Sequence, residues 1–224
     1  MKATFSAKPR SERTMKRILL IDDHEVVREG VKKILNVKPD TTVFGEANAA
    51  PGALKLVREQ DWDVVLLDLS LGGRSGLELL KELKQIRPKL PVLILSMHPE
   101  EQYARRAFKA GASGYVTKDS SKAELVEAVN SVAAGGKYVS RALAEKLIFD
   151  LDRDSDRPPH ETLSDRELEV MRLLASGKTI TEIASLLSLS DKTISTYRAR
   201  VLEKIGINTN AELIRYAIEN KLVD

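Results

Sequence analysis

The amino-acid sequence predicts two domains: a doubly wound α/β domain with a five-stranded parallel sheet, followed by a small all-α domain of four helices. Three observations predict this arrangement. From Arg17 to about Ala134, short apolar runs alternate with amphipathic stretches of helix length. Residues 151–160 form a charged stretch with a proline pair, which is typical of a linker. From Thr162 onward, closely spaced helical patterns begin with capping signals.

The apolar runs of the first domain are the expected strands. Unbroken runs of Ile, Leu and Val are typical of strands buried on both faces of a parallel sheet. The five runs are Arg17–Ile21, Thr42–Glu46, Val64–Leu67, Pro91–Leu95 and Gly114–Thr117. The intervening patterns predict helices over His24–Asn36, Ala50–Glu59, Gly76–Arg87, Glu100–Ala110 and Lys122–Ala134.

Changes in composition predict the domain boundaries. We expect residues 1–14 to be a flexible basic tail and residues 15–136 to form the α/β domain. Residues 137–161 would contain a short helix over Arg141–Phe149 and the linker. Residues 162–224 would form the helical domain.

The second domain should contain four helices, of which the middle two form a helix-turn-helix pattern. The expected helices are Asp165–Ser176, Ile180–Leu187, Asp191–Ile205 and Asn210–Asn220. Capping boxes are expected for the first, second and fourth helices, at Ser164 with Glu167, Thr179 with Glu182, and Thr209 with Glu212. The four-residue turn Ser188–Asp191 would join the second and third helices.

Composition excludes several classes of protein. The 224 residues include no cysteine, which excludes disulfides and cysteine-ligated metals. Neither an apolar run near the roughly 20 residues that span a bilayer nor a hydrophobic signal segment is present, so we expect a cytoplasmic protein without membrane contact. The net charge is +3, but residues 158–224 carry nine Lys/Arg against ten Asp/Glu. Nucleic-acid binding there must therefore depend on local clustering of cations.

Three carboxylates occur where expected strands end. Asp22 and Asp23 follow the first apolar run, and Asp68 follows the third. Because parallel strands present their carboxyl ends at one side of the sheet, these side chains should converge there. Converging carboxylates repel one another unless a hard cation lies among them, and Mg²⁺ with oxygen ligands is the natural choice. The pattern predicts a Mg²⁺-assisted phosphoryl site, whereas His24 and His98 are expected to be surface loop residues.

Two further residues belong to the same side of the sheet. Ser96 closes the fourth apolar run, and Lys118 lies just past the fifth. A carboxylate can attack a phosphoryl group to give an acyl phosphate, while Mg²⁺ held by Asp23 and Asp68 screens the approaching anion. Lys118 could then pair with phosphoryl oxygens, and the Ser96 hydroxyl could donate to one of them.

With these residues, roughly Lys16 to Ala134 resembles the receiver domains of two-component response regulators. The matching motifs are Asp22-Asp23, the strand-end Asp68, Ser96 in Leu-Ser-Met-His, Gly111-Ala112 within Lys109–Tyr115, and Lys118. The resemblance implies a flavodoxin-like fold with strand order 2-1-3-4-5. It also implies a Mg²⁺ site of Asp22, Asp23, Asp68 and Ser70, phosphorylation of Asp68 by a sensor histidine kinase, and a coupled rearrangement of Ser96 and Tyr115.

One position departs from the receiver pattern. Receivers often have proline four residues after the phosphoacceptor, where this chain has Gly72. Glycine permits more backbone conformations than proline does. We therefore expect a looser loop at this point.

Leu163 to Val223 resembles the LuxR-type DNA-binding domain. The matching segments are Leu163–Val170, Glu182–Ala184 and Lys192–Gly206. The third helix would be the recognition helix, with Ser195, Thr196 and Ala199 at base edges and Lys192 and Arg198 on phosphates. The expected DNA-binding residues are Lys192, Ser195, Thr196, Arg198, Ala199, Arg200, Thr179 and Thr181. A solvated basic helix face is the alternative for Arg198 and Arg200.

The two halves together resemble a response regulator of the NarL/FixJ family. The resemblance implies a transcriptional regulator, not an enzyme, that binds double-stranded DNA. In this family the unphosphorylated receiver often masks the recognition helix, so phosphorylation would release it and promote homodimer formation. The last helix would supply the DNA-bound dimer contact through Leu213, Ile214, Ala217 and Ile218.

Two other classes remain as alternatives. A phosphatase that forms an aspartyl phosphate usually carries a second Asp two residues after the nucleophile, where this chain has Ser70. An interaction module that works without phosphorylation is the other alternative. The intact set of acidic residues argues against it.

Overall fold

The computed structural model describes residues 15–36, 42–71, 74–97, 100–141, 143–144 and 158–223. The chain divides into two compact units: residues 1–71 and 76–144 make up the first, and residues 72–75 and 145–224 are grouped in the second. The predicted tail and the predicted linker up to residue 157 lie outside the described residues, as does most of the helix expected over Arg141–Phe149. Within the part that is described, no helix is long and apolar enough to cross a membrane.

The first unit is built on a parallel sheet in the order β2-β1-β3-β6-β7. Its strands are β1 (Lys16–Ile21), β2 (Thr42–Ala47), β3 (Val64–Leu67), β6 (Val92–Ser96) and β7 (Gly114–Thr117). With β6 and β7 as fourth and fifth strands, this is the predicted order 2-1-3-4-5. The sequence did not predict β4 (Ser70–Leu71) and β5 (Arg74–Ser75), which pair as a separate two-stranded sheet. Gly72, where we expected a looser loop, lies outside the described residues.

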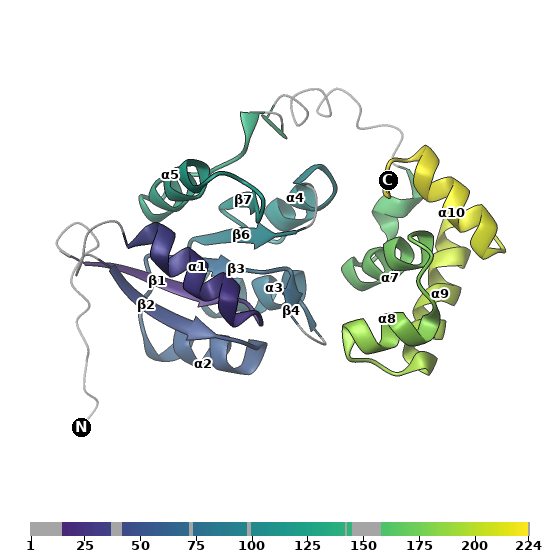
Figure 1. Ribbon diagram of the computed structural model, residues 1–224, viewed down its shortest axis with the longest axis horizontal. Helices are drawn as coiled ribbons and strands as arrows, with labels where there is room; N and C mark the ends of the chain where they lie inside the picture. The colour runs from purple at the N-terminus through teal and green to yellow at the C-terminus, as the bar shows by residue number, and fades with distance from the viewer. Residues whose placement is uncertain are drawn as a thin grey trace. The chain divides into compact units, whose positions relative to one another are not determined.

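Five helices cover the two faces of this sheet, as predicted for a doubly wound fold. They are α1 (Glu25–Leu35), α2 (Ala50–Glu59), α3 (Gly76–Ile86), α4 (Glu100–Lys109) and α5 (Lys122–Ala133). Helices α1 and α5 pack together on one face, and α2, α3 and α4 lie side by side on the other (Figure 1). Alternate strand residues such as Ile18, Leu66 and Leu93 form the core beneath α1 and α5.

Backbone hydrogen bonds continue past the strand ends and fix the residues that follow them. The Asp22 amide donates to the Ala47 carbonyl at 3.1 Å, and the Asp68 amide donates to the Ile21 carbonyl at 2.9 Å. The Lys118 amide donates to the Ser96 carbonyl at 2.9 Å. The residues just beyond β1, β3 and β7 are therefore held on the same side of the sheet.

Trp62 lies just before β3, at the end of the sheet opposite to Asp22 and Asp68. Its ring is buried against Gly45 of β2, where a Cβ atom would lie 2.2 Å from the indole. The indole N–H donates to the Leu56 carbonyl at 3.1 Å, and the Arg17 guanidinium lies 5.3 Å from the ring centroid. Trp62 is therefore a packing residue.

The second unit contains the four predicted helices, preceded by a 3₁₀ turn, η2 (Pro159–Thr162). The helices are α7 (Asp165–Ala175), α8 (Ile180–Leu187), α9 (Asp191–Ile205) and α10 (Asn210–Glu219). The three predicted capping boxes are all formed. Ile183, Ile194 and Val201 are fully buried and pack α8 against α9.

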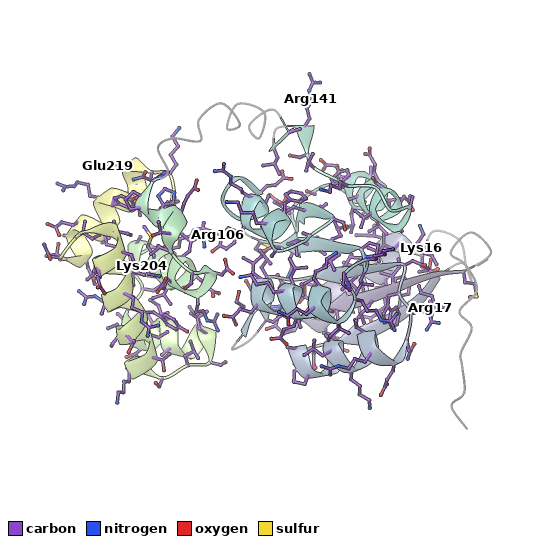
Figure 2. The ribbon with its side chains drawn as sticks, turned by 180° about the vertical axis from the view of Figure 1, so that it is seen from behind. Lys16, Arg17, Arg106, Arg141, Lys204 and Glu219 are labelled. Atoms are coloured by element: carbon purple, nitrogen blue, oxygen red, sulfur yellow. The ribbon has the colours of Figure 1, made fainter. Side chains whose placement is uncertain are left out.

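Glu167 is the most buried acidic group of the second unit's described residues. Its carboxylate accepts from the Ser164 amide at 2.7 Å and from the Lys204 ammonium at 2.6 Å, which joins α7 to α9. Lys204 is labelled in Figure 2. Burial alone would raise the pKa of Glu167. The hydrogen bonds from Lys204 and Ser164 outweigh it, so this pKa lies below its usual value.

We predict that substituting Gly76 destabilises the first unit. A Cβ on Gly76 would lie 2.3 Å from the Asp68 carbonyl oxygen and 2.5 Å from the Leu69 Cα, which are backbone atoms that cannot rotate away. We expect Gly76→Ala to lower the free energy of unfolding by about 1–3 kcal/mol, the usual cost of overpacking. The measurement is urea unfolding followed by Trp62 fluorescence.

Gly30→Ala is the matched control for that experiment. Gly30 lies in α1 with open space around the Cβ position. Alanine there should increase stability by about 0.5–1 kcal/mol, because glycine is a poor helix former. A Gly76→Ala protein as stable as the Gly30→Ala protein would contradict the packing described here.

We also predict that Glu167 makes the second unit sensitive to acid. Because its pKa is lower in the folded state, its contribution is present above the unfolded pKa of about 4.3 and is lost as pH falls through the folded pKa. Glu167→Gln should flatten this loss. The measurement is hydrogen exchange of α7 amides between about pH 7 and about pH 4, with Glu219→Gln at an exposed position as the control. An unchanged acid sensitivity in Glu167→Gln would refute this assignment.

Candidate phosphoacceptor site and nucleic-acid interface

The structure brings the three predicted carboxylates together. One ligand atom each from Asp22, Asp23, His24 and Asp68 lies within 4.8 Å of the others. Asp68 is 2% exposed and Asp22 is 5% exposed, whereas Asp23 faces solvent. Two buried carboxylates and one solvent-exposed carboxylate therefore share a single site.

Lys118 lies between the two buried carboxylates. Its ammonium nitrogen is 2.8 Å from Asp68 Oδ2 and 2.7 Å from Asp22 Oδ2. Burial lowers the pKa of Lys118, but the hydrogen bonds to Asp22 and Asp68 outweigh it and the pKa lies above its usual value. The lysine therefore carries its charge across the physiological pH range.

Two effects act in opposite directions on the pKa of the Asp68 carboxyl. Burial raises the pKa of its carboxyl, while the hydrogen bond from Lys118 acts in the opposite direction. The Ser70 amide also donates to Asp68 Oδ1, at 3.2 Å. Ser70 thus lies beside Asp68 through its backbone, and its role in the metal site stays a prediction.

Ser96 and Tyr115 occupy adjacent strands behind the acidic residues. Both are completely buried, and their side chains share a hydrogen bond. Burial raises the pKa of the Tyr115 phenol, so the ring stays neutral. The two predicted switch residues are therefore in direct contact.

His24 is an exposed residue beside the acidic residues, as the sequence predicted. Its Nδ1 lies 2.8 Å from Asp23 Oδ1 and 3.3 Å from Asp22 Oδ1, and its amide donates to Asp22 Oδ1 at 2.8 Å. The imidazole is 66% exposed, so it lies on the solvent side of the site. Its position directly after the acidic pair was the available signal, and His98 lies outside the described residues.

The donor set fits a hard divalent cation. Three carboxylates supply oxygen ligands, and one lysine leaves the group with a net negative charge. Mg²⁺ prefers oxygen ligands from one or two carboxylates together with water and phosphate. The exposed Asp23 leaves one side of the site open for those ligands.

The third helix of the second unit presents the predicted DNA-binding residues on its outer face. Ile194 and Val201 of α9 are buried against the rest of the unit. The predicted contacts Lys192, Ser195, Thr196, Ala199 and Arg200 are exposed. Arg198 is partly buried, and its Nε donates to Asn210 Oδ1 at 2.7 Å.

Three threonine hydroxyls in this region already have partners within the protein. Thr179 caps α8 and donates to Glu182 at 2.8 Å, while Thr181 donates to Asp191 at 2.9 Å and joins α8 to the start of α9. The Thr196 hydroxyl donates to the Lys192 carbonyl at 2.9 Å. A phosphate contact by one of these hydroxyls would require its single O–H donor to exchange partners, whereas a donor group on a base could bind the remaining lone pairs.

The structure reduces the number of α10 residues that are available for the predicted dimer contact. Leu213 and Ala217 are completely buried within the second unit, so they are core residues and are not available to a partner. Ile218 is 55% exposed and Ile214 is partly buried. Amphipathic spacing predicted an apolar face correctly but did not show which of its residues the domain's own core would take.

Both halves of the chain match known families. Residues 18–130 match the response regulator receiver domain, and residues 161–217 match the luxR family of bacterial regulatory proteins. The response regulator UvrY of Escherichia coli K12 is 34% identical over 93% of this chain and 96% of its own length. The response regulator GacA of Pseudomonas aeruginosa is 34% identical over 94% of this chain and 99% of its own length.

A solved structure supports the same grouping. RcsB of Salmonella enterica serovar Typhimurium, bound to promoter P1flhDC in the presence of the phosphomimetic BeF3-, has a TM-score of 0.57 and 27% identity. The match covers 91% of this chain and 98% of that one. A receiver followed by a luxR-type domain is the organisation of a two-component response regulator with a DNA-binding output domain. This chain belongs to the NarL/FixJ family of these regulators.

We predict that Lys118 stabilises the metal-free first unit. Removing it would leave two buried carboxylates without their cation, and breaking such a pair costs about 3 kcal/mol or more. Lys118→Gln should unfold at lower urea concentration in chelator, and Mg²⁺ should restore part of the loss. The exposed Lys122→Gln is the control. Equal stability of the two variants in chelator would contradict this role of Lys118.

Proposed function

We propose that the protein is a transcriptional regulator controlled by phosphorylation of Asp68 by a sensor histidine kinase, with Mg²⁺ at Asp22, Asp23, Asp68 and Ser70. The observation that carries the proposal is a buried carboxylate held by a charged lysine beside further carboxylates. The family of the chain supports the same assignment.

Phosphoryl transfer follows from the geometry of Asp68. A carboxylate oxygen of Asp68 attacks the phosphorus of a phosphohistidine, and the P–O bond forms as the P–N bond breaks. The histidine nitrogen leaves with the electron pair and takes a proton from solvent. Lys118 pairs with the phosphoryl oxygens, and bound Mg²⁺ would neutralise part of the charge on them.

The new phosphoryl group would change the contact between Ser96 and Tyr115. A phosphoryl oxygen competes with the Tyr115 phenol for the Ser96 hydroxyl, so the pair rearranges. The Tyr115 amide lies 3.4 Å from the Tyr138 carbonyl, beyond α5. Glu100, the first residue of α4, accepts from the amide and hydroxyl of Ser140. A shift at Tyr115 or α4 would thereby reach the segment that leaves this unit.

The output is sequence-specific binding to double-stranded DNA. Helix α9 enters the major groove, with Ser195, Thr196 and Ala199 at base edges. The same helix contacts DNA through Lys192, Arg198 and Arg200, and Lys192 and Arg198 bind phosphates. From α8, Thr179 and Thr181 also contact phosphates. The promoter-bound state of RcsB supports this assignment.

Phosphorylation would also control assembly. In this proposal the receiver of residues 15–136 masks α9 until Asp68 is phosphorylated. The released domain of residues 162–224 then binds DNA as a homodimer through Ile214 and Ile218 of α10. The protein works in the cytoplasm, where its kinase partner presents the phosphohistidine.

The proposal predicts that a phosphodonor sharpens DNA binding only when Asp68 is present. The experiment measures binding to a genomic fragment pool by intact protein and by Asp68→Asn, each with and without a small-molecule phosphodonor and Mg²⁺. Phosphodonor should increase sequence-specific binding by intact protein and leave Asp68→Asn unchanged. Asp119→Asn, an exposed position close in sequence to Lys118, should respond like intact protein.

Three outcomes would contradict parts of this proposal. Equal and specific binding in all conditions would keep DNA binding and remove control by phosphorylation. A phosphodonor response retained in Asp68→Asn would place the phosphorylated residue elsewhere. Absence of specific binding in every condition would remove the DNA-binding assignment.

A further inference from the structure

The side chain of Arg28, in α1, binds the backbone of the loop that follows β1 and carries Asp22 and Asp23, called here the acidic loop. Its Nη1 donates to the main-chain carbonyl oxygen of Asp22 at 2.8 Å. Its Nε donates to Glu46 Oε2 at 2.9 Å, at the end of β2. The side chain is only 14% exposed. One guanidinium therefore connects the acidic loop, α1 and β2.

Glu46 is itself well anchored. Its second oxygen, Oε1, lies 2.5 Å from the Lys32 ammonium, which also contacts Glu29 at 2.5 Å. The hydrogen bond from Lys32, with a further one from Arg28, outweighs burial and holds the pKa of Glu46 below its usual value. The Arg28 guanidinium is thus bound to a fully charged carboxylate and has little freedom to rotate away.

These contacts fix the orientation of one peptide group. The Asp22 amide is already bound to the Ala47 carbonyl at 3.1 Å, and Arg28 binds the Asp22 carbonyl on the other side of the residue. The Asp22 carbonyl and the Asp23 amide belong to the same planar peptide unit. Arg28 therefore sets the direction in which Asp23 leaves the backbone toward Asp68.

We propose that Arg28 is a positioning residue for the metal site, acting through the Asp22–Asp23 peptide. This inference rests on the proposed function, because it assumes that Mg²⁺ binds at these carboxylates. Arg28 reaches no ligand atom of the site in the described residues. Residues that orient metal ligands without touching the metal typically change its affinity by about 10- to 100-fold when they are replaced.

Arginine is needed for this task because two donors on one rigid plane reach two acceptors at once. Lysine keeps the positive charge, but its single ammonium lacks the planar fork that binds both Glu46 and the Asp22 carbonyl. Arg28→Lys therefore separates positioning from charge. Lys32→Gln is the matched control, because it removes a cation from Glu46 and leaves the Arg28 contact to Asp22 in place.

The experiment measures the Mg²⁺ affinity of the full chain by isothermal titration calorimetry for intact protein and both variants. Arg28→Lys should bind Mg²⁺ about 10-fold more weakly, and Lys32→Gln should stay within about two-fold of intact protein. Phosphorylation of Arg28→Lys by a small-molecule phosphodonor should be slow at low Mg²⁺ and recover at saturating Mg²⁺. Glu46→Gln, which weakens the anchor of Arg28, should lie between the two variants if Arg28→Lys folds poorly.

The outcomes separate this inference from the proposed function. If intact protein binds no Mg²⁺ or accepts no phosphoryl group, the proposed function fails. If intact protein does both and Arg28→Lys binds Mg²⁺ as tightly, the positioning role is overturned. Equal weakening in Arg28→Lys and Lys32→Gln would also overturn it, because it would indicate a general effect of lost ion pairing at Glu46.

Discussion

Electrostatic repulsion between carboxylates is the constraint on which the first unit depends. Asp22 and Asp68 are both removed from water at the ends of neighbouring strands, an arrangement that is costly unless a cation lies between them. Lys118 supplies that cation from a third strand end, at 2.7 and 2.8 Å. The same charge balance leaves a negative group at the solvent side that favours a divalent ion. In the proposed function, a phosphoryl group arriving there would meet a site in which the charged groups are already held in place.

The rest of the architecture serves to hold these charges in place. Parallel strands deliver Asp22, Asp68 and Lys118 to one side of the sheet, and backbone hydrogen bonds beyond the strand ends fix each of them. Helix α1 adds Arg28, which binds the carbonyl of Asp22, and α3 begins at Gly76 directly against the backbone of Asp68. Ser96 and Tyr115, the proposed switch pair, are buried and neutral, so the proposed rearrangement would move no charge through the core.

The sequence predicted the sheet and the meeting of Asp22, Asp23 and Asp68, because apolar runs locate strand ends and parallel strands share a direction. The strand order was implied by the resemblance to receiver domains. It did not predict the Arg28 contact, since a helical arginine looks the same whether it faces solvent or a carbonyl from another element. Nor did it reveal that Leu213 and Ala217 are core residues, because apolar spacing on α10 does not say what covers each position. The sequence did predict that His24 is exposed, but it did not show the contact of its imidazole with Asp23.

The packing of Trp62 has a consequence for optical work on this protein. It is the single tryptophan in the chain, and it lies between β2 and the start of β3, at the end of the sheet opposite to Asp68. Its emission therefore comes from the first unit alone, with the Arg17 guanidinium near the ring as a neighbour that affects its brightness. Circular dichroism at helix wavelengths, by contrast, collects signal from both units. Coincident melting curves would indicate that the receiver and the DNA-binding domain unfold as one cooperative body. Different melting curves would indicate that the two domains unfold separately.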